Sequence, residues 1–302
     1  RVRRLPSTRP YTRFPYTSGR PNSNVLRPWT NGMDITRRYS GTWIIDFGIG
    51  MSENEAALYE APFEYAVKYI KPLRVGKRED RANQRWWLMQ RTRPELRSAV
   101  ALLSRFIATP RVAKYRLFIW LSSIVLPDSR VCAIARSDDA TFGILHSRIH
   151  EQWSLATCSW HGVGNDPTYN AHSCFETFPF PEGLTPNIPA TDYANDPRAQ
   201  AIADAACKLN ELRENWLNPP QWVDRVPEVV PGYPDRIIAK PEHAAELKKR
   251  TLTNLYNQRP AWLDHAHRVL DEAVAAAYGW PADLSDDEVL RRLLALNRER
   301  SV

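Results

Sequence analysis

Residues 115–121 read Tyr-Arg-Leu-Phe-Ile-Trp-Leu, and residues 130–135 read Arg-Val-Cys-Ala-Ile-Ala. Both runs are short and rich in β-branched or aromatic residues, which is typical of strands. Between them, Pro127-Asp128-Ser129 predicts a turn. A third strand is expected over 142–145, with a helix after it over 147–155. The middle of the chain is therefore predicted to be β-rich.

The sequence on either side of this region favours helices. Before it, one strand is expected over 42–47, then a helix over 52–70 that Pro62 kinks or splits, and a second helix over 92–106. After it, apolar residues recur at helical spacing, and the expected helices cover about 196–218, 242–257 and 260–278. A last helix is expected to begin at Ser285 and to include Leu294. A proline-rich connector is expected over 219–241.

These patterns predict an α+β fold in three parts. The parts are a basic connecting segment at 1–109, a mixed, β-rich domain at 110–190 and a helical domain at 191–302. A chain of 302 residues with 43% hydrophobic content is long enough for such cores.

The excess of positive over negative charge is confined to the first part of the chain. Residues 1–116 contain 23 Lys and Arg against 9 Asp and Glu, whereas 117–190 contain 3 against 7 and 191–302 contain 15 against 18. The net charge of +7 is thus a strong basic excess followed by a mildly acidic remainder. This asymmetry is typical of proteins that bind nucleic acid. The alternative is a solvated basic surface without a partner.

Cellular location is predicted from what the chain does not contain. No run of about 18 apolar residues occurs, so no membrane-spanning helix is expected. The four cysteines form no Cys-x-x-Cys pair, which favours free thiols in a reducing cytoplasm. The start, Arg1-Val-Arg-Arg, has neither an initiator Met nor an apolar signal core, and we interpret it as part of a longer chain.

Two motifs superficially match methyltransferase loops. Residues 46–50, Asp-Phe-Gly-Ile-Gly, look like a methyl-donor loop, but a basic segment follows where a second parallel strand is needed. Residues 218–221, Asn-Pro-Pro-Gln, look like the catalytic Asn-Pro-Pro-aromatic loop, but they follow a helix and lack the aromatic residue. We interpret the first as an ordinary turn and the second as a helix end.

Other candidate sites are weaker. His146 and His150 have a spacing that metal ligands can use on a helix, and Cys158 and His161 are close in sequence. No acidic base accompanies the histidines, so core or base-contacting histidines are expected instead of a metal site. Pro234-Asp235 is followed by Ile238-Ala239-Lys240, and Ile238 stands where a nuclease motif requires a second, metal-binding acidic residue. No catalytic residue and no metal are predicted.

Several segments carry a family resemblance, in order along most of the chain. They are 24–36, 43–47, 59–65, 141–153, Cys174-Phe-Glu-Thr-Phe-Pro-Phe-Pro181, 256–263 and 276–281. These segments resemble the region that follows the catalytic core in MmeI-like, type IIL N6-adenine DNA methyltransferases. The Phe-Glu-Thr-Phe-Pro-Phe-Pro block is similar to the one that closes their target-recognition domain.

The resemblance implies that DNA recognition and methylation are carried out by different parts of a longer protein. Such proteins methylate adenine N6 in a short target sequence, using S-adenosyl-L-methionine, in restriction-modification or phage defence. Their cofactor and catalytic loops lie upstream of the matching segments. This chain is therefore expected to read DNA sequence, to hold no cofactor itself and to depend on a methyltransferase core that is missing here or sits on another subunit. Double-stranded DNA is the expected partner.

The resemblance and the charge pattern together indicate two groups of candidate DNA-contacting residues. Cations that would contact the DNA backbone are Arg78, Arg81, Arg85, Arg111, Lys114 and Arg116. Side chains that would contact bases are Ser122, Arg130, Arg148, Trp160, His161, Asn165, Asp166, Thr168 and Tyr169. Two alternatives stay open: a DNA-binding interaction or scaffold subunit without methyltransferase activity, and a complete enzyme with a diverged site.

Overall fold

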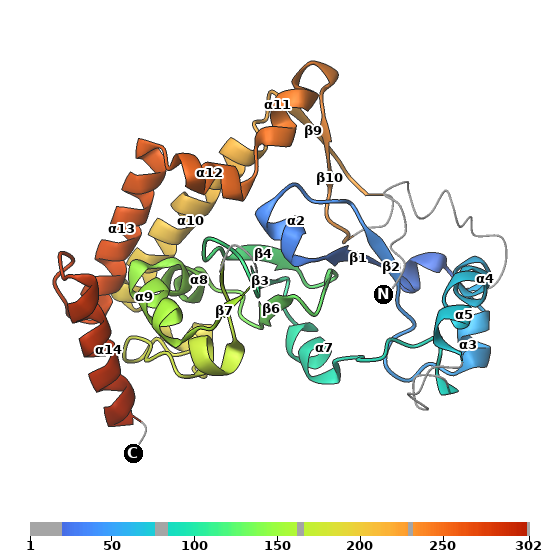
Figure 1. Cartoon of the computed structure of the whole chain (residues 1–302), viewed down its shortest axis with the longest axis horizontal. Helices are drawn as coiled ribbons and strands as arrows, with labels where there is room; N and C mark the ends of the chain where they lie inside the picture. Colours follow the sequence, from blue (N-terminus) through green and yellow to red (C-terminus); the bar gives the residue numbers. More distant parts are fainter. Residues whose placement is uncertain (1–19, 76–83, 162–165, 229–231, 301–302) are drawn as a thin grey trace.

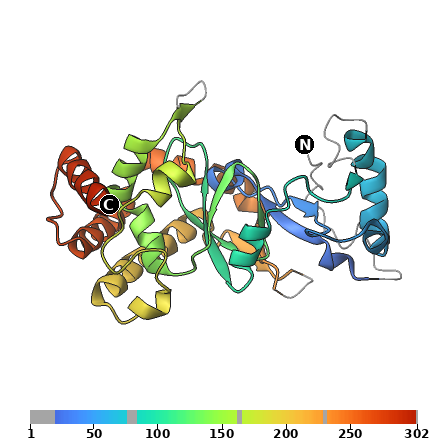
Figure 2. The ribbon, with the colours of Figure 1, turned by 90° about the horizontal axis from the view of Figure 1, so that it is seen from below.

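The computed structural model describes residues 20–75, 84–161, 166–228 and 232–300. Helices and short strands in small sheets form the expected α+β fold (Figure 1). The molecule is elongated: α3, α4 and α5 lie at one end and α13 and α14 at the other, with a three-stranded sheet between them (Figures 1 and 2).

The N-terminal elements extend from one end of the molecule to the central sheet, where α2 packs against β3 (Figure 1). They are η1 (Asn22–Asn24), β1 (Leu26–Thr30), α2 (Gly32–Thr36), β2 (Trp43–Ile45), α3 (Glu53–Ala57), α4 (Glu60–Tyr69), α5 (Lys71–Arg74) and α7 (Pro94–Val100). The helix expected over 52–70 is split in two, as predicted. Ser52 and Glu55 form the predicted capping box, and Pro62 lies in the first turn of α4, where a missing N–H is tolerated.

The central elements run from the three-stranded sheet to the segment that contains Phe178-Pro-Phe-Pro181. They are β3 (Arg105–Pro110), β4 (Ile119–Ser122), β5 (Leu126–Pro127), β6 (Val131–Ile134), α8 (Asp139–His146), α9 (Arg148–Thr157), β7 (Trp160–His161), β8 (Asp166–Pro167) and η2 (Ala171–Glu176). The strand order is β4-β3-β6, all antiparallel, with Ile107 paired to both Trp120 and Ile134.

The C-terminal elements are mostly helical. They are η3 (Ala190–Tyr193), α10 (Pro197–Leu217), β9 (Val223–Val226), β10 (Arg236–Ala239), η4 (Pro241–His243), α11 (Ala244–Lys249), α12 (Leu252–Gln258), α13 (Ala261–Ala277) and α14 (Asp286–Arg300). Asp196 caps α10 and Pro197 opens it, as predicted. The helix expected over 242–257 is two helices, because Thr251 caps α12 anew.

Two sequence predictions in the central region were wrong, and the strand expected over 115–121 is shorter than predicted, because β4 begins only at Ile119. The helix expected to reach Phe106 ends at Val100, and β3 follows as the central strand because it hydrogen-bonds to partners on both sides. Residues 142–145 belong to α8 and not to a strand. Every residue from Ala140 to His146 is buried, so the hydrophobic pattern of α8 has no polar face to reveal its helical period.

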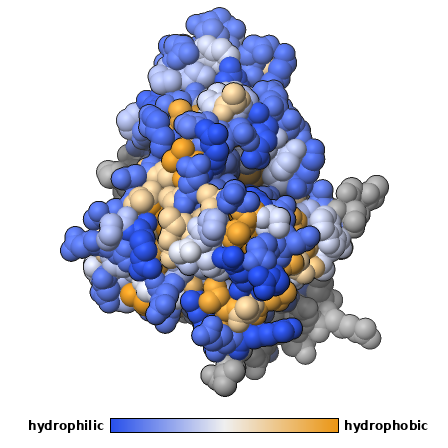
Figure 3. Space-filling view, turned by 90° about the vertical axis from the view of Figure 1, so that its left-hand side faces the viewer, coloured by the Kyte–Doolittle hydropathy of each residue, from blue (hydrophilic) through white to orange (hydrophobic). Residues whose placement is uncertain are grey.

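The largest core cluster joins the central region to the C-terminal helices. It extends without a break from Ile107 on β3 to Leu293 on α14, and includes the fully buried Phe118, Phe142 and Ile202. Helix α10 packs against both α8 and α13. The apolar stripe predicted for α13 faces inward, and hydrophilic side chains cover most of the outer face that carries α13 and α14 (Figure 3).

The expected connector over 219–241 contains a β-hairpin, β9–β10, that the sequence did not reveal. Tyr233 lies in the segment that joins β9 to β10, and its ring is 5.3 Å from the Trp43 ring. The Tyr233 hydroxyl is 2.7 Å from the carbonyl oxygen of Ser23 and 2.9 Å from that of Leu26. The connector therefore ties the C-terminal half of the chain to the strands of the N-terminal end.

His146, His150 and His267 are core residues. The His146 Nε2 atom accepts from Arg213 Nη1 at 2.7 Å, and the Tyr169 hydroxyl lies 3.1 Å from His150 Nε2. Burial lowers the pKa of His150 and of His267 to about 3 each, and that of His146 well below its usual range. These rings are neutral packing elements, as the interpretation of 146–150 as core histidines predicted.

Stability is expected to fall as the pH drops from about 7 to about 5. The unfolded histidines bind protons below about pH 6.5 while the buried ones stay neutral, so each proton favours unfolding by about 2 kcal/mol at about pH 5. Burial raises the pKa of Asp271 to about 6 and also raises the pKa of Glu151, so two carboxyl groups oppose the effect of the three histidines. Urea midpoints measured at both pH values test this, and an unchanged midpoint would contradict it.

Candidate nucleic-acid interface

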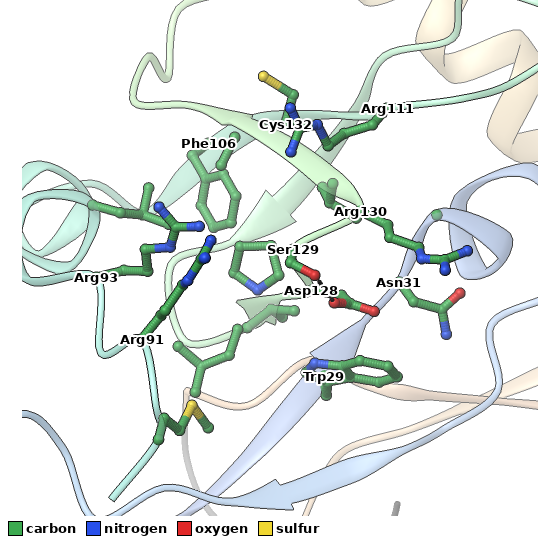
Figure 4. Close-up of a pocket in the computed structure, with 18 of the residues that line it drawn as sticks. Trp29, Asn31, Arg91, Arg93, Phe106, Arg111, Asp128, Ser129, Arg130 and Cys132 are labelled. Carbon is green, nitrogen blue, oxygen red and sulfur yellow. Dashed lines mark hydrogen bonds between the residues drawn. The ribbon is translucent and has the colours of Figure 1, made fainter. Parts of the chain in front are cut away.

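A groove with a cavity volume of about 3300 Å³ runs between the N-terminal end and the central sheet. One wall comes from the loop before α7, and the other from β3, β6 and the turn between β5 and β6. Figure 4 shows Arg91 and Arg93 entering from the first wall and Arg111 and Arg130 from the second, with Asp128 and Ser129 between them.

The groove is built where the first and second parts of the chain meet. Strand β1 pairs in parallel with β5, matching Trp29 with Leu126 and Thr30 with Pro127. The Asp128 N–H donates to the Thr30 carbonyl at 2.8 Å and continues this pairing into the turn. Strand β1 was not expected from the sequence, because Arg27 and Pro28 interrupt its apolar pattern.

The groove lining is strongly cationic. Among the described residues that line it, one carries a carboxylate, Asp128, and seven are arginines: Arg27, Arg74, Arg91, Arg93, Arg97, Arg111 and Arg130. Three of these arginines have internal partners. Arg27 donates to the Tyr233 hydroxyl, Arg74 to backbone carbonyls and Arg97 to the carboxylate of Asp46.

The other four arginines are exposed and available. Within the parts of the chain that the structure describes, the side chains of Arg91, Arg93, Arg111 and Arg130 have no hydrogen-bond or ion-pair partner. A guanidinium is always charged and presents five N–H donors that fit phosphate oxygens. Four such groups on two facing walls make a surface suited to a polyanion.

Arg93 has an unusual backbone. Its φ of 51° lies in the left-handed region, and it occupies the N-cap position of α7 immediately before Pro94. A non-glycine residue in this region costs about 1 kcal/mol, a strain that often occurs at functional sites. The conformation turns the chain sharply at the groove wall, next to Arg91.

A charge pair fixes the position of that wall. Arg97 on α7 donates to both carboxylate oxygens of Asp46, at 2.8 and 2.9 Å. Asp46 follows β2 and has a nearly buried side chain, so the pair anchors α7 to the N-terminal strands. The same contact explains residues 46–50 as a structural turn, because the acidic group there is already bound.

Replacing Asp46 by alanine is expected to destabilise the fold by about 2 kcal/mol. This is below the value for a fully buried pair, because Arg97 is partly exposed. Urea unfolding measures the loss, and Glu95→Ala, which removes an exposed carboxylate from α7, is the control. Equal midpoints for the two variants would show that the pair contributes nothing.

The structure separates the cations predicted to contact the DNA backbone. Arg111 lines the groove, while Arg85 is exposed outside it. Lys114 lies against α12, where it donates to Asn257 at 2.8 Å. Arg78 and Arg81 lie outside the described residues.

The prediction that Arg116 contacts the DNA backbone was wrong. Its guanidinium is buried, donates to the carbonyls of Pro110 and Pro167, and lies 4.8 Å from the centre of the Tyr169 ring. All of these partners are internal, so the side chain holds the central domain together and cannot reach a phosphate in this conformation.

Two of the predicted base contacts are also corrected. Tyr169 borders the groove, but its side chain is 1% exposed and its hydroxyl contacts His150, so it cannot stack on a base. Arg148 donates to the carboxylate of Asp286 and the carbonyl of Leu284, which ties α9 to the C-terminal helix.

The remaining predicted base contacts lie in or beside the groove. Ser122, Arg130, His161 and Thr168 line it. Trp160 is 52% exposed on β7, and Asp166 pairs with His161 in the β7–β8 ribbon. Asn165 lies outside the described residues. Sequence reasoning missed Arg91, Arg93 and Asp128. For Arg91 and Arg93, a signal was present in the sequence: both lie in a basic stretch before α7, and no predicted element was expected to bury them.

The other motifs have structural roles. Asn218 is the C-cap of α10, and its side-chain oxygen accepts from Arg38 at 2.8 Å, which agrees with a helix end. Among the described residues, no group of three or more metal-ligating side chains is found. None of the helices in the described part of the chain is long and apolar enough to cross a membrane.

Comparison with known proteins shows a likeness in fold. No family model and no curated protein matches the chain. A solved structure of the type IIL restriction-modification enzyme MmeI, in complex with DNA, matches 93% of this chain with a TM-score of 0.61 and 17% sequence identity. The chain covers 31% of that protein, so it is similar in fold to about a third of a larger enzyme.

Proposed function

We propose that this chain recognises a short sequence in double-stranded DNA, as the target-recognition part of a site-specific N6-adenine DNA methyltransferase in restriction modification or phage defence. The methyl donor, S-adenosyl-L-methionine, and the catalytic residues would come from a methyltransferase core elsewhere in the parent protein or on a second subunit. The alternative is a scaffold subunit that binds DNA without sequence preference.

The observation that carries the proposal is the set of four available arginines on two facing walls of one groove. Arginines without internal partners on opposite walls can contact the phosphates of both strands of a duplex held between them. The likeness in fold to an enzyme whose structure was solved in complex with DNA also supports DNA binding by this chain.

Holding the DNA duplex and reading its sequence require different contacts. Phosphate contacts hold the duplex in register and carry no sequence information, whereas contacts to base edges select the target. A methyltransferase must also extrude its adenine from the stack, so a separate module has to keep the flanking duplex in place. The rigid sheet beside the groove can provide such support, because β3 is hydrogen-bonded on both sides.

Duplex binding by the full 302-residue chain tests the proposal. A pool of duplexes with a randomised central segment is equilibrated with the protein at moderate salt, and the bound fraction is sequenced. We expect enrichment of one short sequence and an affinity that falls steeply as salt rises. Salt-dependent binding without enrichment would favour the scaffold alternative, and absence of binding would contradict both.

A further inference from the structure

We propose that Asp128, on the turn between β5 and β6, is a base-reading residue that selects a base pair by accepting a hydrogen bond from an exocyclic amino group. This inference rests on the proposed function and adds a specificity determinant to it. From the sequence, Asp128 was expected only to be part of a turn.

Asp128 is the acidic residue in the described lining of a strongly basic groove. Asp128 carries a carboxylate in a groove whose described lining otherwise includes seven arginines, and it faces the space where a polyanion would lie. A carboxylate repels phosphate, so at this place it weakens the binding of every duplex. A group that lowers general affinity in a DNA groove needs another role, and base selection supplies one.

Within the described residues, the Asp128 carboxylate has no ion-pair partner and accepts no hydrogen bond from the backbone. Aspartate at the start of a turn commonly accepts a hydrogen bond from the backbone two residues later. Here its contact is with the neighbouring Ser129 hydroxyl, which donates to Oδ1 at 2.9 Å. In the described ranges no cation pairs with it, although Arg130 is two residues away. The other oxygen, Oδ2, is left available.

Backbone hydrogen bonds hold the turn that carries Asp128 in place. Besides the bond from the Asp128 N–H to Thr30, the Val131 N–H donates to the Asp128 carbonyl at 2.9 Å. The Arg111 N–H donates to the Arg130 carbonyl at 2.8 Å, and Gly32 lies close to that carbonyl. A side chain on a backbone fixed at both ends can read a base without first being ordered.

The chemistry of a carboxylate limits what it can read. An ionised carboxylate only accepts hydrogen bonds. In the major groove the base-pair donors are the N4 amino group of cytosine and the N6 amino group of adenine. Asp128 is therefore expected to favour a base that presents an amino group at its position and to reject guanine and thymine there.

The test compares the base preferences of the wild-type chain and Asp128→Ala, measured by selection from the randomised duplex pool. We expect the preference at one base-pair position to fall about 10-fold, with the other positions unchanged. Binding to unrelated duplexes should stay equal or increase, because one repulsive charge is gone. Glu182→Ala removes an exposed carboxylate outside the groove and should leave the whole profile unchanged.

The outcomes separate this inference from the proposed function. If the wild type selects a sequence and Asp128→Ala selects the same one with the same strength, the inference is wrong and the proposed function stands. If the wild type selects nothing, both are contradicted. Melting temperatures show whether Asp128→Ala folds. If it does not, Asp128→Asn, which keeps the size of the side chain, must show the altered preference at the same single position, or the inference fails.

Discussion

Replacing Arg91, Arg93 and Arg111 together by alanine is expected to weaken duplex binding about 100-fold at physiological salt. Each arginine that neutralises a phosphate releases counterions, and each such contact is worth about 5-fold in affinity under these conditions. The dependence of log affinity on log salt should lose about 3 units of slope. Titration of the two proteins with one duplex at several salt concentrations measures both quantities.

A charge-matched variant is the control for this result. Lys248, Arg268 and Arg298 are exposed on the C-terminal helices, and their replacement by alanine removes the same charge from outside the groove. This variant should bind nearly as well as the wild type, with a nearly unchanged slope. If the two variants lose equal affinity, the effect comes from net charge, and the groove has no special role.

Replacing Gly143 by valine is expected to destabilise the protein by about 3 kcal/mol. A Cβ atom at this position on α8 would lie 2.6 Å from the Cγ2 atom of Ile202 and 3.0 Å from the Cβ atom of Ala206, both on α10. It would also lie 3.1 Å from Leu270 on α13. Three helices meet at this point in the core, so the larger side chain has no room without moving a helix.

Urea unfolding of Gly143→Val beside Gly50→Val provides the comparison. Gly50 is exposed, and a Cβ there would meet no atom within 4 Å. Its replacement should change the free energy of unfolding by less than about 1 kcal/mol. A small effect at Gly143 would show that α8, α10 and α13 do not pack as closely as described.

Much of the fold could be predicted from local sequence signals. The capping box at Ser52 and Glu55 and the N-cap at Asp196 appear where expected, because these signals depend on a few neighbouring residues. Strand β3 and helix α8 could not be predicted in this way. Pairing on both sides determines β3, and complete burial conceals the period of α8.

The candidate site was predicted as a region and not as a set of side chains. The basic excess of residues 1–116 pointed to a polyanion surface, and the groove includes arginines from that part. Burial decides which of those arginines are available: Arg116 is bonded to carbonyls inside the domain, whereas Arg111, five residues earlier, is exposed. Charge in the sequence does not distinguish these two environments, since each depends on contacts between distant segments.

The most direct test of the central claim, that duplex DNA binds in this groove, is to map where the DNA touches the protein. A duplex carrying photoreactive bases is crosslinked to the full chain, and the attached peptides are identified by mass spectrometry. The account predicts attachment to peptides that contain the loop before α7 and the turn at 128–130. Attachment confined to α13 and α14 would contradict it.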